Sequence, residues 1–394
     1  MLTKDILGDK ALAEEVIAMR RHIHAHPGVS EHEEETMKYI ASKMEEWGIP
    51  YQAEVADTGL VALITGEAGE GPVVGLRADI DALPIQEEAD VPYASTIPGV
   101  MHACGHDAHT AILLGAAKTL NEMKSQLKGS VKLFFQPAEE SIGGAARMIA
   151  EGCMENPHVD YVLGLHVETN HQSGHIGIKY GKMYAASDMI DITIHGKGSH
   201  GAMPHDGVDT IAVAAAIIST VQTVVSRNVS PLNSAVCSFG MIRGGTVRNQ
   251  IADKVELSGI LRTLDPETRL FVRNQVKSIV EGVAASMGAS AEYKVTESYG
   301  PLINNDEVVA MVEKNARELL GADKIVLEQD PELGCEDFSY FATERPSCFY
   351  HLGCYHEKLG ERIGVHNSSF TLDEDCLIVG VALQVKNVLT LLGQ

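Results

Sequence analysis

The first half of the chain alternates between two kinds of apolar pattern. Short, almost unbroken apolar runs occur at residues 73–79, 131–136 and 161–166, and such runs are typical of strands that are covered on both faces of a parallel sheet. Between them, segments such as 108–124 carry apolar residues at helical spacing. A regular exchange of strands and helices predicts a doubly wound α/β sheet.

The pattern changes near residue 187. Residues 189–195 alternate between apolar and polar positions, as in a half-exposed strand. The strands and helices predicted from here on lie at 189–195 (strand), 209–227 (helix), 235–240 and 253–264 (strands), 267–287 (helix) and 291–296 (strand). A βαββαβ order of this length indicates a ferredoxin-like module.

Beyond Gly300 the alternation of helix and strand resumes and closes with a helix at 374–392. We therefore expect an α/β domain with a doubly wound mixed sheet, formed by residues 1–186 and 297–394. A smaller ferredoxin-like α+β domain, residues 187–296, is inserted into it. A chain of 394 residues exceeds the size at which one hydrophobic core keeps growing, which agrees with two domains.

The charge and composition of the chain disfavour some classes of binding partner. The net charge of −23 disfavours nucleic acid and anionic membrane surfaces, because no basic field would gather phosphates. The N-terminus lacks a secretory pattern, and no apolar run approaches the roughly 20 residues that span a bilayer. The seven cysteines are odd in number and widely scattered, as reduced thiols are. We expect a cytoplasmic protein with neither a nucleic-acid nor a membrane partner.

Candidate metal-binding and catalytic residues lie in a polar loop and at the end of a strand. Cys104 and His106 flank a glycine in a polar loop, so a buried structural thiol is the weaker interpretation. Glu139 and Glu140 follow the strand 131–136, at the edge where open α/β sheets place ligands. Cysteine, histidine and glutamate are the side chains of a hydrolytic metal site. One glutamate would serve as a metal ligand and the other as a proton carrier.

Four further side chains are ambiguous by themselves. His166 ends a second buried strand, where a structural role is as plausible as a ligand role, and His366 in a Gly-Val-His-Asn segment is similar. Asp79 and Asp81 end a third strand and could be ligands or carboxylates that orient an imidazole. For both aspartates we favour the orienting role.

The inserted domain offers a histidine, an amide and a guanidinium. His200 lies in a glycine-rich loop, Asn249 follows Gly245-Thr-Val-Arg, and Arg262 closes Gly259-Ile-Leu. Taken singly, they would be a turn histidine, a capping asparagine and a surface arginine.

Six motifs in fixed order give these residues a context. They are Arg77-Ala-Asp-Ile-Asp-Ala-Leu-Pro, His102-Ala-Cys-Gly-His-Asp, Gln136-Pro-Ala-Glu-Glu, Gly164-Leu-His, Gly198-Ser-His-Gly-Ala-Met-Pro-His and His366-Asn-Ser-Ser-Phe. Together they resemble the hippurate hydrolase and auxin-conjugate hydrolase branch of the aminoacylase and carboxypeptidase G metallopeptidase family. The resemblance runs from Arg21 to the last helix.

The resemblance implies a metal centre and roles for its surroundings. The implied ligands are Cys104, His106, Glu140, His166 and His366, which suit two divalent metal ions; Mn, Zn, Ni and Co are all compatible with them. Glu139 takes the place of the general base. His200 would stabilise the oxyanion from the inserted dimerisation (lid) domain of a partner subunit, which implies a homodimer. The cysteine is a departure from the broader family, which often uses an aspartate bridge.

The implied reaction is hydrolysis of the amide bond of N-acyl-L-amino acids, with hippurate-like or N-acetyl substrates. Asn249 would assist at the oxyanion, and Arg262 would pair with the carboxylate of this small-molecule substrate. Alternatives are a dipeptidase or aminopeptidase, and a hydrolase of aryl-glutamate conjugates. A metal-dependent binding protein on a degenerate scaffold is disfavoured because all five ligands and Glu139 are present.

Overall fold

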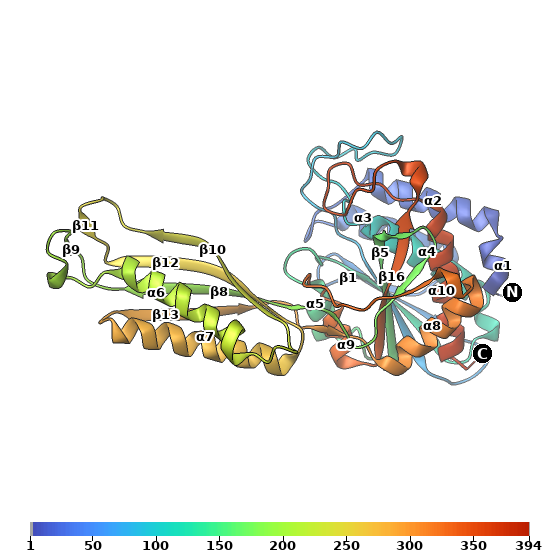
Figure 1. Ribbon diagram of the computed structural model, residues 1–394. Helices are drawn as coiled ribbons and strands as arrows, with labels where there is room; N and C mark the ends of the chain where they lie inside the picture. Colours follow the sequence, from blue (N-terminus) through green and yellow to red (C-terminus); the bar gives the residue numbers. More distant parts are fainter. Residues whose placement is uncertain (1–2, 394) are drawn as a thin grey trace. The chain divides into compact units, whose positions relative to one another are not determined.

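The computed structural model describes residues 3–393, which divide into two compact units (Figure 1). Unit 1 contains residues up to 181, 304–329 and 340 onward, and unit 2 contains 182–303 and 330–339. Compared with the predicted insertion at 187–296, these boundaries add 182–186, 297–303 and 330–339 to unit 2.

Unit 1 is built on an eight-stranded sheet with the order β1-β2-β4-β3-β5-β16-β6-β15. Its central strands β4, β3, β5 and β16 run parallel, whereas β1–β2, β2–β4 and β16–β6 are antiparallel pairs. The strands are β1 (Tyr51–Val55), β2 (Gly59–Thr65), β3 (Val73–Asp79), β4 (Ser130–Gln136), β5 (Tyr161–Gln172), β6 (Ile176–Ile178), β15 (Ile325–Leu327) and β16 (Ser347–Tyr355). The expected mixed sheet is confirmed.

Helix α4 (His106–Glu122) is buried along almost its whole length, because it lies against the sheet and is also covered by other helices. Gly115 permits this packing: a Cβ there would lie 2.7 Å from Val16 Cγ2 and 2.8 Å from Val381 Cγ2. The helices of unit 1 are α1 (Thr3–Leu7), α2 (Lys10–Ala25), α3 (Glu34–Trp47), α4, α5 (Gly144–Ala150), α8 (Asp306–Leu320) and α10 (Asp375–Leu391); α9 (Ser339–Glu344) begins at the last residue of unit 2 and continues in unit 1.

Unit 2 has a four-stranded antiparallel sheet with the order β10-β12-β8-β13 and two helices packed on it (Figure 1). This is the strand order of a ferredoxin-like βαββαβ module. The elements are β7 (Lys182–Tyr184), β8 (Ala186–His195), β9 (Ser199–His200), α6 (Thr210–Thr223), β10 (Ala235–Gly244), β11 (Gln250–Ile251), β12 (Lys254–Thr263), α7 (Pro266–Ser286), β13 (Ser290–Glu297) and β14 (Leu302–Ile303).

The helix Thr210–Asn228, α6 with the turn that follows it, is long and apolar enough to cross a membrane by length and composition alone. From the sequence we expected no apolar segment of this length. Its side chains Val213, Ile217 and Val221 are fully buried in the core of unit 2. In this structure the helix is one layer of an α+β module.

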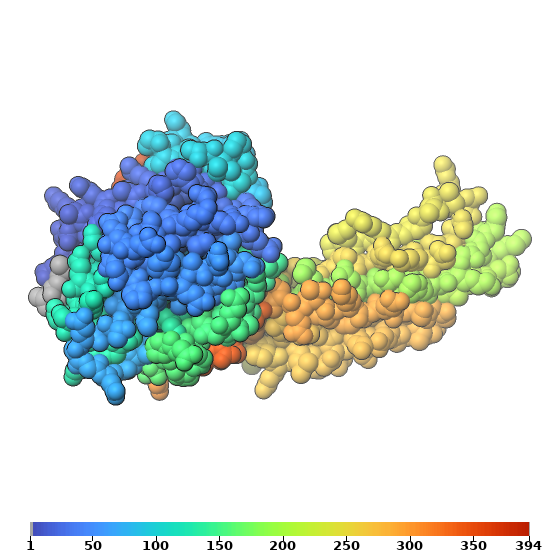
Figure 2. Space-filling view, turned by 180° about the vertical axis from the view of Figure 1, so that it is seen from behind, coloured from blue at the N-terminus to red at the C-terminus, as the bar shows by residue number. Residues whose placement is uncertain are grey.

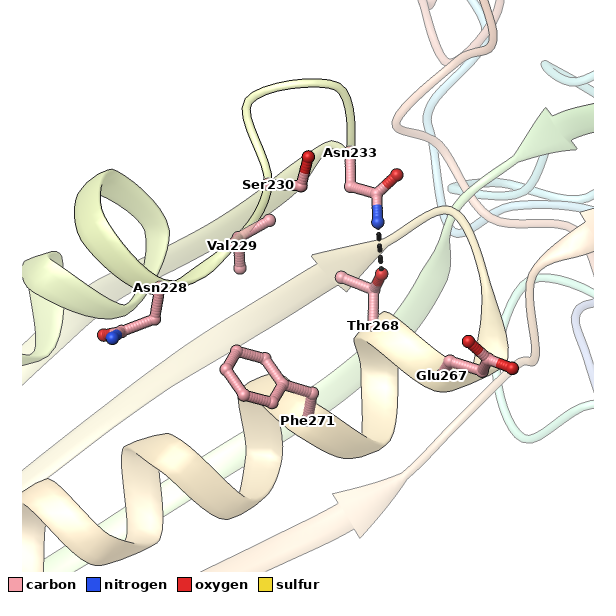
Figure 3. A pocket seen from close by; sticks show the side chains of 7 residues that line it. All are labelled: Asn228, Val229, Ser230, Asn233, Glu267, Thr268 and Phe271. Atoms are coloured by element: carbon pink, nitrogen blue, oxygen red, sulfur yellow. Dashed lines mark hydrogen bonds between the residues drawn. The ribbon is translucent and has the colours of Figure 1, made fainter.

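A hollow in unit 2 lies where this helix ends (Figure 3). Its lining consists of Asn228, Val229, Ser230, Asn233, Glu267, Thr268 and Phe271. Asn233 Nδ2 donates to Thr268 Oγ1 at 3.1 Å. Seen from behind, golden residues of α7 lie along the lower edge of unit 2 (Figure 2). Leu270 and Phe271 on that helix are exposed.

Candidate metal centre

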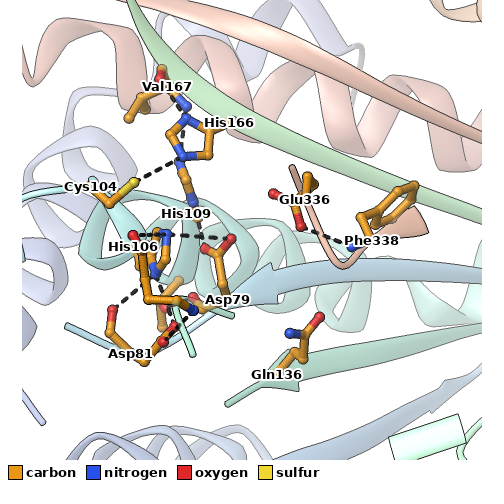
Figure 4. Close-up of polar contacts among 12 residues, drawn as sticks. Asp79, Asp81, Cys104, His106, His109, Gln136, His166, Val167, Glu336 and Phe338 are labelled. Carbon is orange, nitrogen blue, oxygen red and sulfur yellow. Dashed lines mark hydrogen bonds and ion pairs between the residues drawn. The ribbon is translucent and has the colours of Figure 1, made fainter. Parts of the chain in front are cut away.

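The predicted ligands are placed by the central elements of unit 1. His106 opens α4, His166 lies within β5, and Glu139 and Glu140 follow β4 after a proline. Because β3, β4 and β5 are parallel, their carboxyl ends meet at one edge of the sheet. Figure 4 shows His106, His166 and Cys104 turned toward one another above this edge.

The five predicted ligands converge on the sulfur of Cys104. Its Sγ is 3.4 Å from His166 Nε2 and 3.3 Å from His366 Nε2. Glu140 Oε1 lies 3.0 Å from His366 Nε2 and 3.9 Å from His106 Nε2. Cys104 thus belongs to two groups whose ligand atoms lie within 4.8 Å of one another, one with His106 and His166 and the other with Glu140 and His366.

Hydrogen bonds fix the tautomers of two of these imidazoles. His106 Nδ1 lies 2.9 Å from the carbonyl oxygen of Asp81, and His166 Nδ1 lies 2.7 Å from that of Val167. A carbonyl only accepts, so both rings carry a proton on Nδ1, and Nε2 is the atom through which either ring would bind a metal ion. His106 Nε2 is buried and has no hydrogen-bond partner. A divalent cation would satisfy this atom, so the residues fit such an ion.

The electrostatics of the site also favour a cation. Burial by itself would lower the pKa of His106, but Asp79, Asp81 and Glu140 raise it to about 10. Burial and the charges of Glu140 and Glu139 raise the pKa of the Cys104 thiol well above its usual value. The site therefore holds an excess of negative charge around buried ligand atoms, which a metal ion would balance.

The two aspartates after β3 contact different imidazoles. Asp79 accepts from Arg77 Nη1 and His109 Nδ1 at 2.7 and 2.6 Å, and lies 3.7 Å from His106 Nε2. Asp81 is the carboxylate at His106 Nδ1, at 3.1 Å, and it also accepts from the backbone N–H of Glu140 at 3.0 Å. Asp81 therefore orients the His106 imidazole, whereas Asp79 orients the imidazole of His109.

His109 was not singled out from the sequence. Its Nδ1 donates to Asp79, and its Nε2 accepts the backbone N–H of Val167 at 2.9 Å, so both ring nitrogens are in use. Its role is to hold β5, which carries His166, against α4. The spacing of His106 and His109, one helical turn apart, is the sequence signal that would have indicated two imidazoles on one face.

Unusual backbone conformations surround the ligands. Gly105 has φ +94°, and a Cβ there would lie 2.4 Å from Val167 Cγ2, so this position requires glycine. Ala138 (φ +55°) precedes the two glutamates, and His366 itself has φ +61°. Left-handed conformations of residues other than glycine persist only where the surroundings enforce them, and they are common at functional sites.

The other three predicted site residues lie in unit 2. His200 is exposed on β9, opposite Gln250 of β11, and Asn249 precedes that strand. The backbone N–H of Gly201 donates to the Asn249 carbonyl at 2.8 Å, so His200 and Asn249 are neighbours in one small hairpin-like structure. Arg262 is half-buried on β12, where its guanidinium donates to Ser187 Oγ.

Comparison with known proteins identifies the family. Residues 75–389 match the model of Peptidase family M20/M25/M40. N-acetyl-L-cysteine deacetylase of Bacillus subtilis (strain 168) is 40% identical over 93% of this chain and 86% of its own. N-acyl-L-amino acid amidohydrolase of Geobacillus stearothermophilus is 43% identical over 74% of this chain and 79% of its own.

A solved structure agrees with this relationship. The YxeP protein of Bacillus subtilis, described as a dinuclear metal binding peptidase from the M20 family, has a TM-score of 0.85 and 35% identity. The similarity covers 98% of this chain and 99% of that one. The chain therefore belongs to peptidase family M20/M25/M40 and is a hydrolase that acts on amide bonds.

Proposed function

We propose that this enzyme is a metal-dependent amidohydrolase of the hippurate and auxin-conjugate branch, which cleaves N-acyl-L-amino acids into a carboxylic acid and a free amino acid. The observation that carries the proposal is the convergence of five ligand side chains on Cys104, beside the buried Glu139. The names of relatives support the substrate class: N-acetyl-L-cysteine deacetylase, N-acyl-L-amino acid amidohydrolase and an IAA-amino acid hydrolase of Arabidopsis thaliana.

Two divalent ions, Mn, Zn, Ni or Co, would be held by Cys104, His106, Glu140, His166 and His366. Two overlapping ligand groups that share Cys104 support a pair of ions over a single one. When bound, the ions would polarise the scissile carbonyl and lower the pKa of a water molecule.

Glu139 is the proton carrier of the proposed reaction. Its side chain is 7% exposed, and one of its oxygens belongs to a compact group with His106 and Glu140. From this position Glu139 accepts the proton of the attacking water and delivers it to the leaving amine. Glu140, whose Oε1 lies between the imidazoles of His106 and His366, is assigned as the ligand.

The residues of unit 2 complete the proposal. His200, exposed on β9, donates to the oxyanion from a partner subunit, and Asn249 beside it assists at the same oxygen. Arg262 pairs with the substrate carboxylate. The enzyme is then a cytoplasmic homodimer whose site is incomplete without the second chain.

The test compares Glu139→Gln with Glu140→Gln. Glu139→Gln should lower kcat by about 10²- to 10⁴-fold, the usual contribution of a general base, and leave the metal content unchanged. Glu140→Gln should lower the bound metal itself, because a neutral amide replaces a charged ligand. Elemental analysis of both variants beside kcat on N-acetyl-cysteine and hippurate provides the readout.

Two results would overturn the proposal. Loss of metal from Glu139→Gln with full retention by Glu140→Gln would exchange the roles of the two glutamates. Faster turnover of free-amino dipeptides or of aryl-glutamate conjugates than of any N-acyl amino acid would replace the substrate class.

A further inference from the structure

We propose that His171, Glu328 and His351 form a separate binding site for a divalent transition metal, for which zinc is the best match. His171 Nε2 and His351 Nδ1 each lie 2.7 Å from the same carboxylate oxygen, Oε1 of Glu328. All three ligand atoms lie within 4.8 Å of one another. Two imidazole nitrogens and a carboxylate oxygen are a ligand set that zinc takes in proteins.

The three side chains come from segments that are distant in sequence and joined by the sheet of unit 1. His171 is near the end of β5, Glu328 directly follows β15, and His351 lies within β16. The short strand β6 pairs with both β16 and β15. An ion held here would fasten this end of the sheet, where β6 and β15 are only three residues long.

The backbone of Gly177 leaves room for this cluster. Gly177 of β6 is paired with His351, and a Cβ on Gly177 would lie 2.3 Å from Glu328 Oε1 and 2.7 Å from His171 Nε2. Any larger residue would therefore push into the point on which the three ligands converge. Glycine serves the close approach of the ligand atoms here and not an unusual backbone conformation, since its backbone is paired as an ordinary strand.

This cluster is distinct from the candidate metal centre. His351 is the register partner of His166 in the neighbouring strand. Nevertheless, His166 Nε2 faces Cys104 Sγ, whereas His351 Nδ1 faces Glu328. The two sites share no residue.

Burial and charge suit a bound ion. His351 is 1% exposed, but the His171 and Glu328 side chains are 14% and 17% exposed, so a water molecule can reach the ion as a fourth ligand. Burial would raise the pKa of Glu328, but the hydrogen bonds from His171 and His351 outweigh it and lower the pKa to about 2. Glu328 is thus anionic at neutral pH, and a bound ion would take the place of the protons that His171 Nε2 and His351 Nδ1 donate to it.

The experiment measures zinc binding alone, by titration of metal-stripped protein and by elemental analysis after gel filtration. Glu328→Gln and His171→Gln should each bind one zinc ion fewer per chain than the wild type. His158→Gln is the matched control, because His158 and Glu155 form an exposed pair 2.9 Å apart. The control should bind as much zinc as the wild type.

Equal zinc content in the wild type, Glu328→Gln and His171→Gln would overturn the proposal and leave the cluster as a hydrogen-bonded unit. If Glu328→Gln fails to fold, the more peripheral His171→Gln gives the same comparison. A parallel Cys104→Ser variant separates the two sites. Loss of the Cys104-dependent zinc with retention of the Glu328-dependent zinc would show that the second site stands even if the proposed catalytic centre were wrong.

Discussion

At the scale of single residues, Glu33 shows how a side chain outside the ligand set shapes the site. Its Oε1 accepts the backbone N–H of Ala138 at 2.8 Å, and its Oε2 accepts the hydroxyl of Thr58 at 2.5 Å. Ala138 is the left-handed residue directly before Glu139. Glu33 therefore fixes the turn that aims the two glutamates, and it does so as a fully buried carboxylate.

Glu33 should give folding stability a characteristic pH dependence. Burial is the main cause that raises the pKa of Glu33 in the folded chain above 4.5, its ordinary value. At a pH between the ordinary pKa and the raised one, the folded chain therefore holds more protons than the unfolded chain. The free energy of unfolding should consequently fall as pH rises through this window. Glu33→Gln removes the ionisation and keeps an acceptor for Ala138. The stability of Glu33→Gln relative to the wild type should thus increase from pH 4.5 to 7.5 in urea titrations.

The exposed Glu34→Gln, one residue away, is the control for the Glu33 experiment. A difference between Glu33→Gln and the wild type that stays constant with pH would contradict the role given to burial.

At the scale of elements, a buried ion pair joins α2 to the start of α4. Arg20 Nε lies 2.7 Å from Asp107 Oδ2, and His24 Nδ1 contacts the same oxygen at 2.7 Å. Asp107 directly follows His106 in the first turn of α4. The pair therefore sets the position of the helix end that carries a ligand.

Two adjacent arginines of α2 allow this contribution to be measured. Both lie over the Tyr93 ring and both pair with a carboxylate, but Arg20 is fully buried whereas the side chain of Arg21 is 45% exposed. Arg20→Met should cost about 3–5 kcal/mol, because Asp107 loses its buried guanidinium partner and keeps only His24. Arg21→Met should cost less than about 1 kcal/mol. Equal costs in chemical denaturation would refute the importance of the buried pair.

The elements also show what the sequence could predict about the site. Apolar runs revealed β3, β4 and β5, and the edge rule for parallel strands placed Glu139, Glu140 and His166 together. Such rules could not predict which imidazole each of Asp79 and Asp81 contacts. Asp81 lies past the end of β3, where the alternation of side chains no longer fixes direction, and its partners depend on how α4 packs. The role of Glu33 could not be predicted from the sequence either, because its contact with Ala138 spans 105 residues.

At the scale of the whole molecule, the proposed homodimer makes a prediction about mixed subunits. Glu139→Gln lacks the base in unit 1, and His200→Ala lacks the oxyanion donor in unit 2, so each homodimer should be nearly inactive. If His200 acts on the partner's site, a mixed dimer has one site with both residues. Random exchange of subunits should then restore about a quarter of wild-type activity, because half of the dimers are mixed and each has one intact site.

Assays before and after subunit exchange would test this prediction, with the mixture of each variant with itself as the control. No recovery, in a mixture where mass spectrometry detects mixed dimers, would mean that His200 serves its own chain.

The division of unit 1 into separate chain segments has a consequence for the newly made protein. Cys104, His106, Glu140 and His166 all precede unit 2, whereas His366 follows it. Ribosomes add about 5–20 residues per second, so His366 emerges on the order of ten seconds or more after His166. During that interval β5 lacks its neighbour β16, and the proposed ligand set is one imidazole short. A chain whose synthesis stops before His366 would thus carry four of the five proposed ligands, so amide cleavage at the proposed centre would begin only after unit 2 has been made.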